Sequence, residues 1–283
     1  MTQANSARSG PLLKRRQRHR QILEMLQIEG ELGVEQVCEA LRTSPATVRR
    51  EFAALSGSGR VEKTWGGIRL IGGSAVTAPA FAARLVAQAA EKKAIAKAAS
   101  ELLRDGDVVM IDGGTTTLQL AEFIAQKPIR VITNSMVIAQ AVDQHKGRQR
   151  GAEVHLTGGI LQPESGVVAG PQAEAFLRRY HAAWAFLGAA GIDEQSATNY
   201  NEAVLESERL MIAQSARIAL LADHSKLGRQ AMCTLCPLSQ ITQLITDATP
   251  ATAPFLGKLR QGGLTVREVS TGLAGPGEAG AAA

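Results

Sequence analysis

The sequence has few aromatic residues, few cysteines and no long apolar segment. Phe, Trp and Tyr make up 4% of the 283 residues, and the chain contains three cysteines. A small, odd number of cysteines does not provide a disulfide framework, which favours a reducing compartment. No apolar run approaches the roughly 20 residues that a membrane helix needs, and the N-terminus lacks the apolar part of a secretion signal. We therefore expect a cytoplasmic protein without a membrane partner.

Two of the cysteines, Cys233 and Cys236, form a CxxC motif. A zinc site of this kind needs a second pair of ligands at suitable spacing, and the sequence offers none. Apolar packing is the simpler interpretation of this pair and of Cys38. We expect neither a metal nor another cofactor.

Positive charge is concentrated in the first quarter of the chain. Residues 1–70 contain 12 Lys and Arg against 7 Asp and Glu, whereas residues 71–283 contain 19 of each. The whole net charge of +5 therefore lies at the N-terminal end. A basic end on a balanced body predicts a nucleic-acid-binding module joined to a second domain, and a solvated basic tail is the alternative.

The basic quarter has the pattern of a helix-turn-helix. We expect one helix over about residues 14–28 and a second with apolar residues at i, i+3, i+4 and i+7 from Val34 to Leu41. A third helix begins after a short turn, with Ser44 as N-cap and Pro45 in the first helical position. This spacing is typical of a helix-turn-helix motif.

The third helix has a buried stripe and an outer basic face. Val48, Phe52 and Leu55 point inward, which leaves a small and basic surface that fits the major groove. Residues 60–70 then predict a two-stranded wing around a Gly-Gly pair. A helical hairpin with solvated arginines is the alternative. The expected DNA contacts are Ser44, Thr47, Arg49 and Arg50 on the helix and Lys63 and Arg69 in the wing.

The segment from Val108 to Ile124 passes from an apolar strand through a glycine-rich turn into a helix. The turn contains Asp112, two glycines and three threonines. Glycines allow a close approach of the backbone to a ligand, and the hydroxyls and amides at the helix start suit an anion such as phosphate. The turn matches neither GxxxxGK[ST] nor GxGxxG. A well-capped turn without a ligand is the alternative.

The body of the chain repeats a strand-then-helix pattern after an alanine-rich helical stretch from Phe81 to Leu103. Its apolar runs are VVMI, RVIT, VHLT, WAFLG, ARIALLA, QLIT and LTVREV. This pattern predicts a largely parallel sheet covered on both faces. Polar residues and glycines follow five of the runs, so they are expected to line one crevice at the carboxyl ends of the strands. Polar loops that only reach solvent are the alternative.

Several motifs then occur in a fixed order along the chain. The N-terminal part contains Thr-Val-Arg-Arg and Trp-Gly-Gly, and the rest contains IDGGTTTLQLA, VITNS, LTGG, VAGPQAE, AFLGAAGID and ADHSKLGR. From about Lys14 to Arg267 the chain resembles the DeoR/GlpR family of bacterial transcriptional regulators. The resemblance implies a sensor domain similar to ribose-5-phosphate isomerase-like folds, with the Gly-Thr turn holding a phosphate. The effector contacts that it implies are Asp112, Gly114, Thr115, Thr116, Thr117, Asn134, Gly159 and Lys226.

The chain departs from the family pattern in three places. Gly113 stands where the family often has serine, and Glu51 replaces the more usual aspartate after the arginine pair. In residues 198–212, acidic residues occupy a stretch where a basic one is frequent. This last segment is a candidate for setting sugar specificity.

The expected organisation is a winged helix-turn-helix followed by a mostly parallel α/β domain. We expect a flexible tail over residues 1–13, a DNA-binding domain over 14–70, a linker over 71–80, a sugar-phosphate-sensing domain over 81–270 and a second flexible tail over 271–283.

Two classes of function fit this organisation. The first is a DNA-binding regulator, a repressor of a carbohydrate-metabolism operon, that binds a duplex operator and a phosphorylated sugar. The second is a sugar-phosphate isomerase or transferase with an accessory basic module, in which Asp112, Asp193, Asp223, His224 and Lys226 supply acid and base. An isomerase needs no winged helix, so we favour the regulator and expect no enzyme activity. One short recognition helix rarely gives enough specificity, so we also expect a homo-oligomer, a dimer or tetramer.

Overall fold

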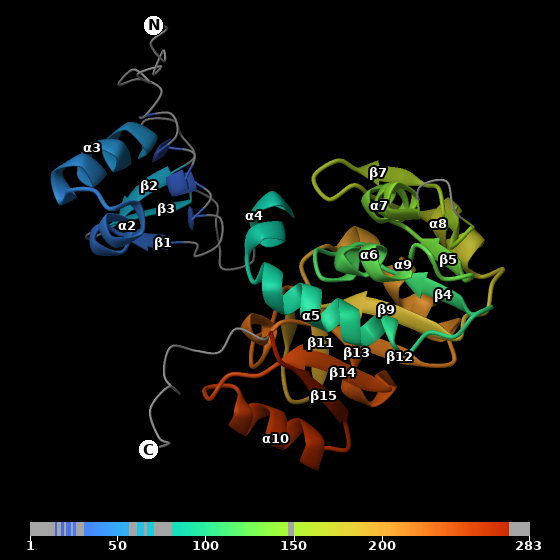
Figure 1. The fold of residues 1–283 in the computed structure, drawn as a ribbon. Helices are drawn as coiled ribbons and strands as arrows, with labels where there is room; N and C mark the ends of the chain where they lie inside the picture. Colours follow the sequence, from blue (N-terminus) through green and yellow to red (C-terminus); the bar gives the residue numbers. More distant parts are fainter. Residues whose placement is uncertain are drawn as a thin grey trace, which may run out of the picture. The chain divides into compact units, whose positions relative to one another are not determined.

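The computed structural model describes residues 15, 18–19, 21–23, 25–26, 31–56, 61–64, 67–70, 81–146 and 150–271. The chain divides into two compact units, Met1–Arg84 and Leu85–Ala283, which are described separately (Figure 1). The expected tail 1–13, the linker 71–80 and all but the first residue of the C-terminal tail lie outside the described residues. Within the described part, no helix is long and apolar enough to cross a membrane.

The N-terminal unit is a winged helix-turn-helix, as the sequence predicts. The described residues between 15 and 26 are helical. They are followed by β1 (Glu31–Gly33), α2 (Val34–Leu41), α3 (Pro45–Ser56), β2 (Val61–Thr64) and β3 (Gly67–Leu70). The three strands are antiparallel in the order β1-β3-β2. Strand β1 was not expected, because a three-residue run is too short to show the alternation of a strand.

The core of this unit comes from the apolar stripes that the sequence shows. Val48, Phe52 and Leu55 of α3 are buried together with Val37 of α2 and Ile68 of the wing. Two local features stabilise the turn between α2 and α3. Arg42 adopts a left-handed conformation after α2, and the Ser44 hydroxyl accepts a hydrogen bond from the Thr47 amide at 3.3 Å. The predicted N-cap is therefore confirmed.

The C-terminal unit is built on a seven-stranded sheet in which every pairing is parallel. The strand order is β15-β14-β12-β9-β4-β5-β6. Each of the seven predicted apolar runs forms one of these strands, which confirms the predicted α/β class. The strands are β4 (Val108–Ile111), β5 (Arg130–Thr133), β6 (Glu153–Leu156), β9 (Trp184–Gly188), β12 (Ile218–Leu221), β14 (Gln243–Asp247) and β15 (Thr265–Val269).

Helices cover both faces of this sheet. Val109 and Ile111 of β4 pack in one cluster, and Met110 between them packs in the other, as alternation along a strand requires. The first face carries α5 (Ala89–Ser100), α6 (Leu120–Ile124) and α7 (Met136–Lys146). The second carries α8 (Pro171–Leu177), α9 (Glu202–Ala213) and α10 (Ala253–Gln261).

The structure corrects the predicted helix from Phe81 to Leu103. It is interrupted, with α4 (Phe81–Val86) ending before α5 begins at Ala89. Gln88 between them has a φ of 47°, a left-handed conformation that ends one helical run and starts another. Alanine-rich sequence favours helix throughout this stretch, so propensity alone does not reveal the break.

Several short antiparallel strands were also not expected. Strands β7 (Ile160–Gln162) and β8 (Val167–Ala169) form a hairpin. A separate sheet has the order β10-β11-β13, from β10 (Gly191–Ile192), β11 (Ser196–Asn199) and β13 (Cys233–Pro237). These strands have two to five residues, which is too few to show a clear alternation in the sequence.

Candidate functional site

The outer face of α3 carries the residues expected to touch DNA. Arg49 and Arg50 are exposed, as is Lys63 on the wing strand β2. Ser44 is exposed at the start of the helix, and its hydroxyl lies 3.0 Å from that of Thr47. Arg69 lies in β3, but its side chain is outside the described residues. The exposed arginines stand opposite the buried stripe of the same helix, as groove binding requires.

Glu51 fixes α3 to the preceding helix. It is buried, and its carboxylate accepts hydrogen bonds from Arg18 at 2.5 and 3.1 Å. The His19 ring lies 2.6 Å away, and Arg15 adds an ion pair at 3.4 Å. Burial alone would raise the pKa of Glu51, but the hydrogen bonds and charges of Arg18 and His19 hold this pKa below its ordinary value. The sequence marked Glu51 only as a departure from a family pattern.

The glycine-rich turn follows β4 and is held by the residue after β5. Asn134 accepts a hydrogen bond from the Gly113 amide at 3.0 Å and donates one to Asp112 at 2.9 Å. Asp112 and Asn134 are both buried. Since β4 and β5 are parallel neighbours, their carboxyl ends bring the two residues together, as predicted.

The three threonines of the turn are buried but differ in their bonding. The Thr117 hydroxyl donates to the Gly114 carbonyl at 3.0 Å, which stabilises the turn itself. The side chains of Thr115 and Thr116 form no hydrogen bond with another described residue. The turn continues into a short 3-10 helix, η1 (Thr117–Gln119), before α6. A helix dipole therefore contributes little to the stabilisation of a bound anion at this turn. The backbone amides and side-chain hydroxyls of the turn are the available anion ligands.

Two glycines near the turn have structural reasons for being glycine. A Cβ atom on Gly113 would overlap Val167 of β8 and approach Ser135 at 3.2 Å. The serine that the family often has at this position would not fit unless the Val167 side chain moved. Gly159 has a φ of 123°, and a Cβ there would lie 2.5 Å from the Ala169 carbonyl oxygen. The close approach of the backbone to β8 is sufficient to explain why residue 159 is a glycine, and no bound ligand is needed for this explanation.

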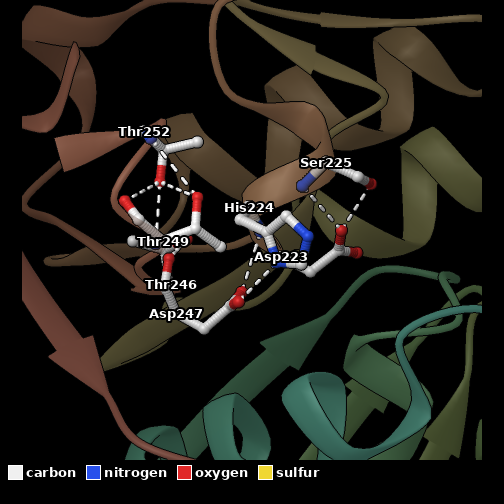
Figure 2. Close-up of polar contacts among 7 residues, drawn as sticks. All are labelled: Asp223, His224, Ser225, Thr246, Asp247, Thr249 and Thr252. Carbon is white, nitrogen blue, oxygen red and sulfur yellow. Dashed lines mark hydrogen bonds and ion pairs between the residues drawn. The ribbon is translucent and has the colours of Figure 1, made fainter. Parts of the chain in front are cut away.

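A second polar cluster lies at the carboxyl ends of β12 and β14 (Figure 2). The His224 amide donates to Asp247 at 2.8 Å, and the His224 ring nitrogen Nδ1 is 2.5 Å from the same carboxylate. Asp223 accepts from the Ser225 amide at 3.0 Å and from its hydroxyl at 2.5 Å. Asp223 is fully buried, and its Oδ2 has no hydrogen-bond partner among the described residues.

Lys226 ends the 3-10 helix η2 (His224–Lys226) beside this cluster. Strand β9 separates β12 from β4, so η2 and the glycine-rich turn leave the same edge of the sheet two strands apart. Asp193, another candidate acid, instead accepts the amides of Gln195 and Ser196 at 2.7 and 2.6 Å. Its carboxylate therefore organises its own loop.

One buried acid next to the turn was not singled out from the sequence. Glu208 of α9 is buried and accepts a hydrogen bond from Asn199 at 2.6 Å. It also shares a hydrogen bond with Asp112. Burial, and then the charge of Asp112, raise the pKa of Glu208 well above its ordinary value. The available signal was the acidic stretch over residues 198–212.

A winged helix-turn-helix joined to a parallel α/β domain is the architecture of a DNA-binding regulator with a second, separate domain. The comparisons agree with this class. Residues 18–72 match the DeoR-like helix-turn-helix domain, and residues 87–248 match the DeoR C terminal sensor domain. The chain belongs to the DeoR family of transcriptional regulators.

Curated relatives match most of the chain. The HTH-type transcriptional regulator GlpR of Haloferax volcanii is 33% identical over 82% of this chain and 90% of its own length. The HTH-type transcriptional repressor GlcR of Bacillus subtilis is 32% identical over 81% of this chain and 87% of its own. The Glycerol-3-phosphate regulon repressor of Escherichia coli is 29% identical over 84% and 93%. These relatives are named as regulators and not as enzymes, in agreement with the regulator hypothesis.

Solved structures show more distant similarity. Ribose 5-phosphate isomerase A of Methanocaldococcus jannaschii is 18% identical, with a TM-score of 0.35 over 48% of this chain and 53% of that chain. A translation initiation factor eIF-2B of Pyrococcus horikoshii is 13% identical, with a TM-score of 0.40 over 84% and 90%.

Proposed function

We propose that this protein represses a carbohydrate-metabolism operon and that a phosphorylated sugar bound in the C-terminal domain controls it. The observation that carries the effector part is the turn after β4. Asn134 holds its first residues, and the hydroxyls of Thr115 and Thr116 form no hydrogen bond with another described residue. The name of the Escherichia coli relative, a glycerol-3-phosphate regulon repressor, supports a phosphorylated effector.

The phosphate is proposed to lie against the turn, with the amides from Gly114 to Thr117 and the hydroxyls of Thr115 and Thr116 as donors. Backbone amides and hydroxyls suit a phosphate because each donates to an anionic oxygen. Lys226, at the same edge of the sheet, is proposed to contact the phosphate or a sugar hydroxyl. The proposed site also includes Asp112, Asn134 and Gly159. These residues are proposed either to support the turn or to contact the sugar.

The DNA-binding part of the proposal assigns residues 14–70 to operator recognition and residues 81–270 to effector binding. Arg49 and Arg50 are exposed on α3, and Lys63 is exposed on β2. These side chains are proposed to contact bases and phosphates of duplex DNA, together with Ser44 and Thr47 at the helix start. Two or four copies of the chain would then read repeated half-sites.

A ligand screen tests the effector directly. The full chain is heated with a panel of phosphorylated sugars and with the same sugars lacking phosphate, and the melting temperature is followed. A ligand present at 100 times its dissociation constant should add about 2.7 kcal/mol to stability. Stabilisation by one phosphorylated sugar and not by its unphosphorylated form is the expected result. Equal stabilisation by both forms would contradict the phosphate site.

A further inference from the structure

The carboxyls of Glu208 and Asp112 form a buried pair beside the glycine-rich turn. Glu208 is 1% exposed and Asp112 is 3% exposed. They come from different elements, since Glu208 lies on α9 and Asp112 follows β4. Glu208 Oε1 accepts from Asn199 at 2.6 Å, whereas its buried Oε2 receives no bond from an N–H or hydroxyl group among the described residues. An orphaned carboxylate oxygen in this position is costly unless it carries a proton.

The hydrogen bond between the two carboxyls needs one proton, because an ionised carboxylate can only accept. The other ionisable groups that act on Glu208 do not replace this proton. Arg209 directs its guanidinium to Glu206 at 2.7 Å and to the Thr234 carbonyl at 2.8 Å. Burial raises the pKa of the Cys236 thiol on β13 to about 12, so that group stays neutral. Burial, and then the charge of Asp112, raise the pKa of Glu208 well above its ordinary value, which assigns the proton to Glu208 and makes it the donor of the pair.

The pair is connected to the turn by a short chain of hydrogen bonds. Asp112 accepts from Asn134 at 2.9 Å, and Asn134 accepts from the Gly113 amide at 3.0 Å. Each link fixes the next, because the Asn134 amide can donate to Asp112 and accept from Gly113 in only one orientation. A continuous series of hydrogen bonds therefore leads from Glu208 through Asp112 and Asn134 to the first amide of the turn.

We propose that Glu208 is a positioning residue for the anion site, which in its protonated form holds Asp112 and Asn134 in the arrangement that binds an anion. Loss of the proton breaks the bond to Asp112 and places a second negative charge beside the turn. Anion binding is therefore coupled to protonation of Glu208. This inference rests on the proposed function, because it requires that the turn binds an anion.

Sulfate is a suitable probe, since its charge does not change around neutral pH. Its affinity for the full chain is measured by calorimetry from mildly acidic to alkaline pH, for the wild type and for Glu208→Gln. Glutamine donates a hydrogen bond at every pH and so mimics the protonated acid. Wild-type affinity should fall about tenfold for each pH unit above the ionisation of Glu208, because one proton is taken up with the anion. The Gln variant should bind as well as the wild type at acidic pH and keep this affinity at alkaline pH.

Glu206→Gln is the matched control, because Glu206 lies on the same helix but is exposed and paired with Arg209. This variant should keep the wild-type pH profile. An infrared band of a protonated carboxylic acid, present in the wild type and absent in Glu208→Gln, gives a second measurement that needs no ligand. Sulfate binding with the same pH profile in wild type and Glu208→Gln would overturn only this inference. No sulfate binding at any pH would overturn the anion-binding turn as well.

Discussion

At the scale of single residues, the threonines of the turn after β4 differ in their hydrogen bonding. Thr117 is fully buried and bonds to the Gly114 carbonyl, so its hydroxyl contributes to the fold of the turn. Thr115 and Thr116 are 6% and 7% exposed, and their side-chain hydroxyls form no hydrogen bond with another described residue. A hydroxyl that stays without a protein partner in a buried site is available for a ligand.

The first prediction follows from this difference. Thr115→Val keeps the shape of the side chain and removes the hydroxyl. Effector affinity should fall by about 1.5 to 3 kcal/mol, the scale of a hydrogen bond to a charged group, with little change in the melting temperature of the free protein. Calorimetry with the sugar phosphate found in the ligand screen measures this loss. Thr265→Val, at an exposed position at the start of β15, is the control and should leave affinity unchanged. Unchanged affinity in Thr115→Val would mean that this threonine only shapes the turn.

The sequence predicted which residues follow the central strands, but not how they are bonded. The proximity of Asp112 to Asn134 follows from parallel neighbouring strands, which apolar runs reveal. Glu208 is different, because α9 carries three glutamates, Glu202, Glu206 and Glu208, and packing alone decides which of them is buried. The steric reason for Gly113 likewise depends on the hairpin strand β8, which has no clear sequence pattern.

At the scale of elements, the recognition helix α3 is held by polar contacts as well as by its apolar stripe. Glu51 is 4% exposed and receives hydrogen bonds from Arg18 and His19 of the first helix. The depressed pKa of Glu51 shows that the hydrogen bonds and charges of these partners outweigh the cost of burial. Removing the carboxylate therefore loosens the attachment of α3 to the first helix.

The second prediction concerns this attachment. Glu51→Gln should lower the stability of the helix-turn-helix by about 1.5 to 3 kcal/mol at neutral pH, measured by hydrogen exchange of the α3 amides. Because the folded pKa of Glu51 lies below its ordinary 4.5, its contribution is present above that pH and is lost as the pH falls through the folded pKa. The difference between wild type and variant should shrink in acid. Glu35→Gln, exposed on α2, is the control. A difference that is constant with pH would argue against the ionic role.

The third prediction separates base reading from phosphate contact on the N-terminal unit. Arg50→Ala should weaken binding to a selected operator by about 1 to 3 kcal/mol more than binding to random duplex DNA, if the side chain reads a base. Lys63→Ala in the wing should weaken binding to both DNAs alike and reduce the salt dependence. Fluorescence anisotropy on the full chain measures both effects. Equal losses on the two DNAs for Arg50→Ala would reassign Arg50 to a phosphate contact.

At the scale of the whole molecule, the sequence predicted the two-part organisation because each part has its own pattern. Apolar stripes of helical period predicted the N-terminal unit, and seven buried runs predicted the parallel sheet of the C-terminal unit. The short antiparallel strands of the C-terminal unit were not predicted from the sequence. Their pairing, such as Ala197 with Cys236, joins residues far apart in sequence, and the strands are too short to show alternation.

The last prediction concerns the coupling between the two units. A sugar phosphate bound near the turn can change operator affinity only by its different affinity for the DNA-competent and DNA-incompetent states, typically about 1 to 3 kcal/mol. Lys226→Ala should keep operator binding and lose the response to the effector, which in a cell would give permanent repression. Binding free energies are reciprocal, so an effector that weakens operator binding tenfold must itself be weakened about tenfold by operator DNA. Both changes in affinity are measured by titrating operator DNA at saturating effector and by titrating the effector at saturating operator DNA. A sugar phosphate that the protein converts to product, with no effect on operator affinity, would contradict the regulator.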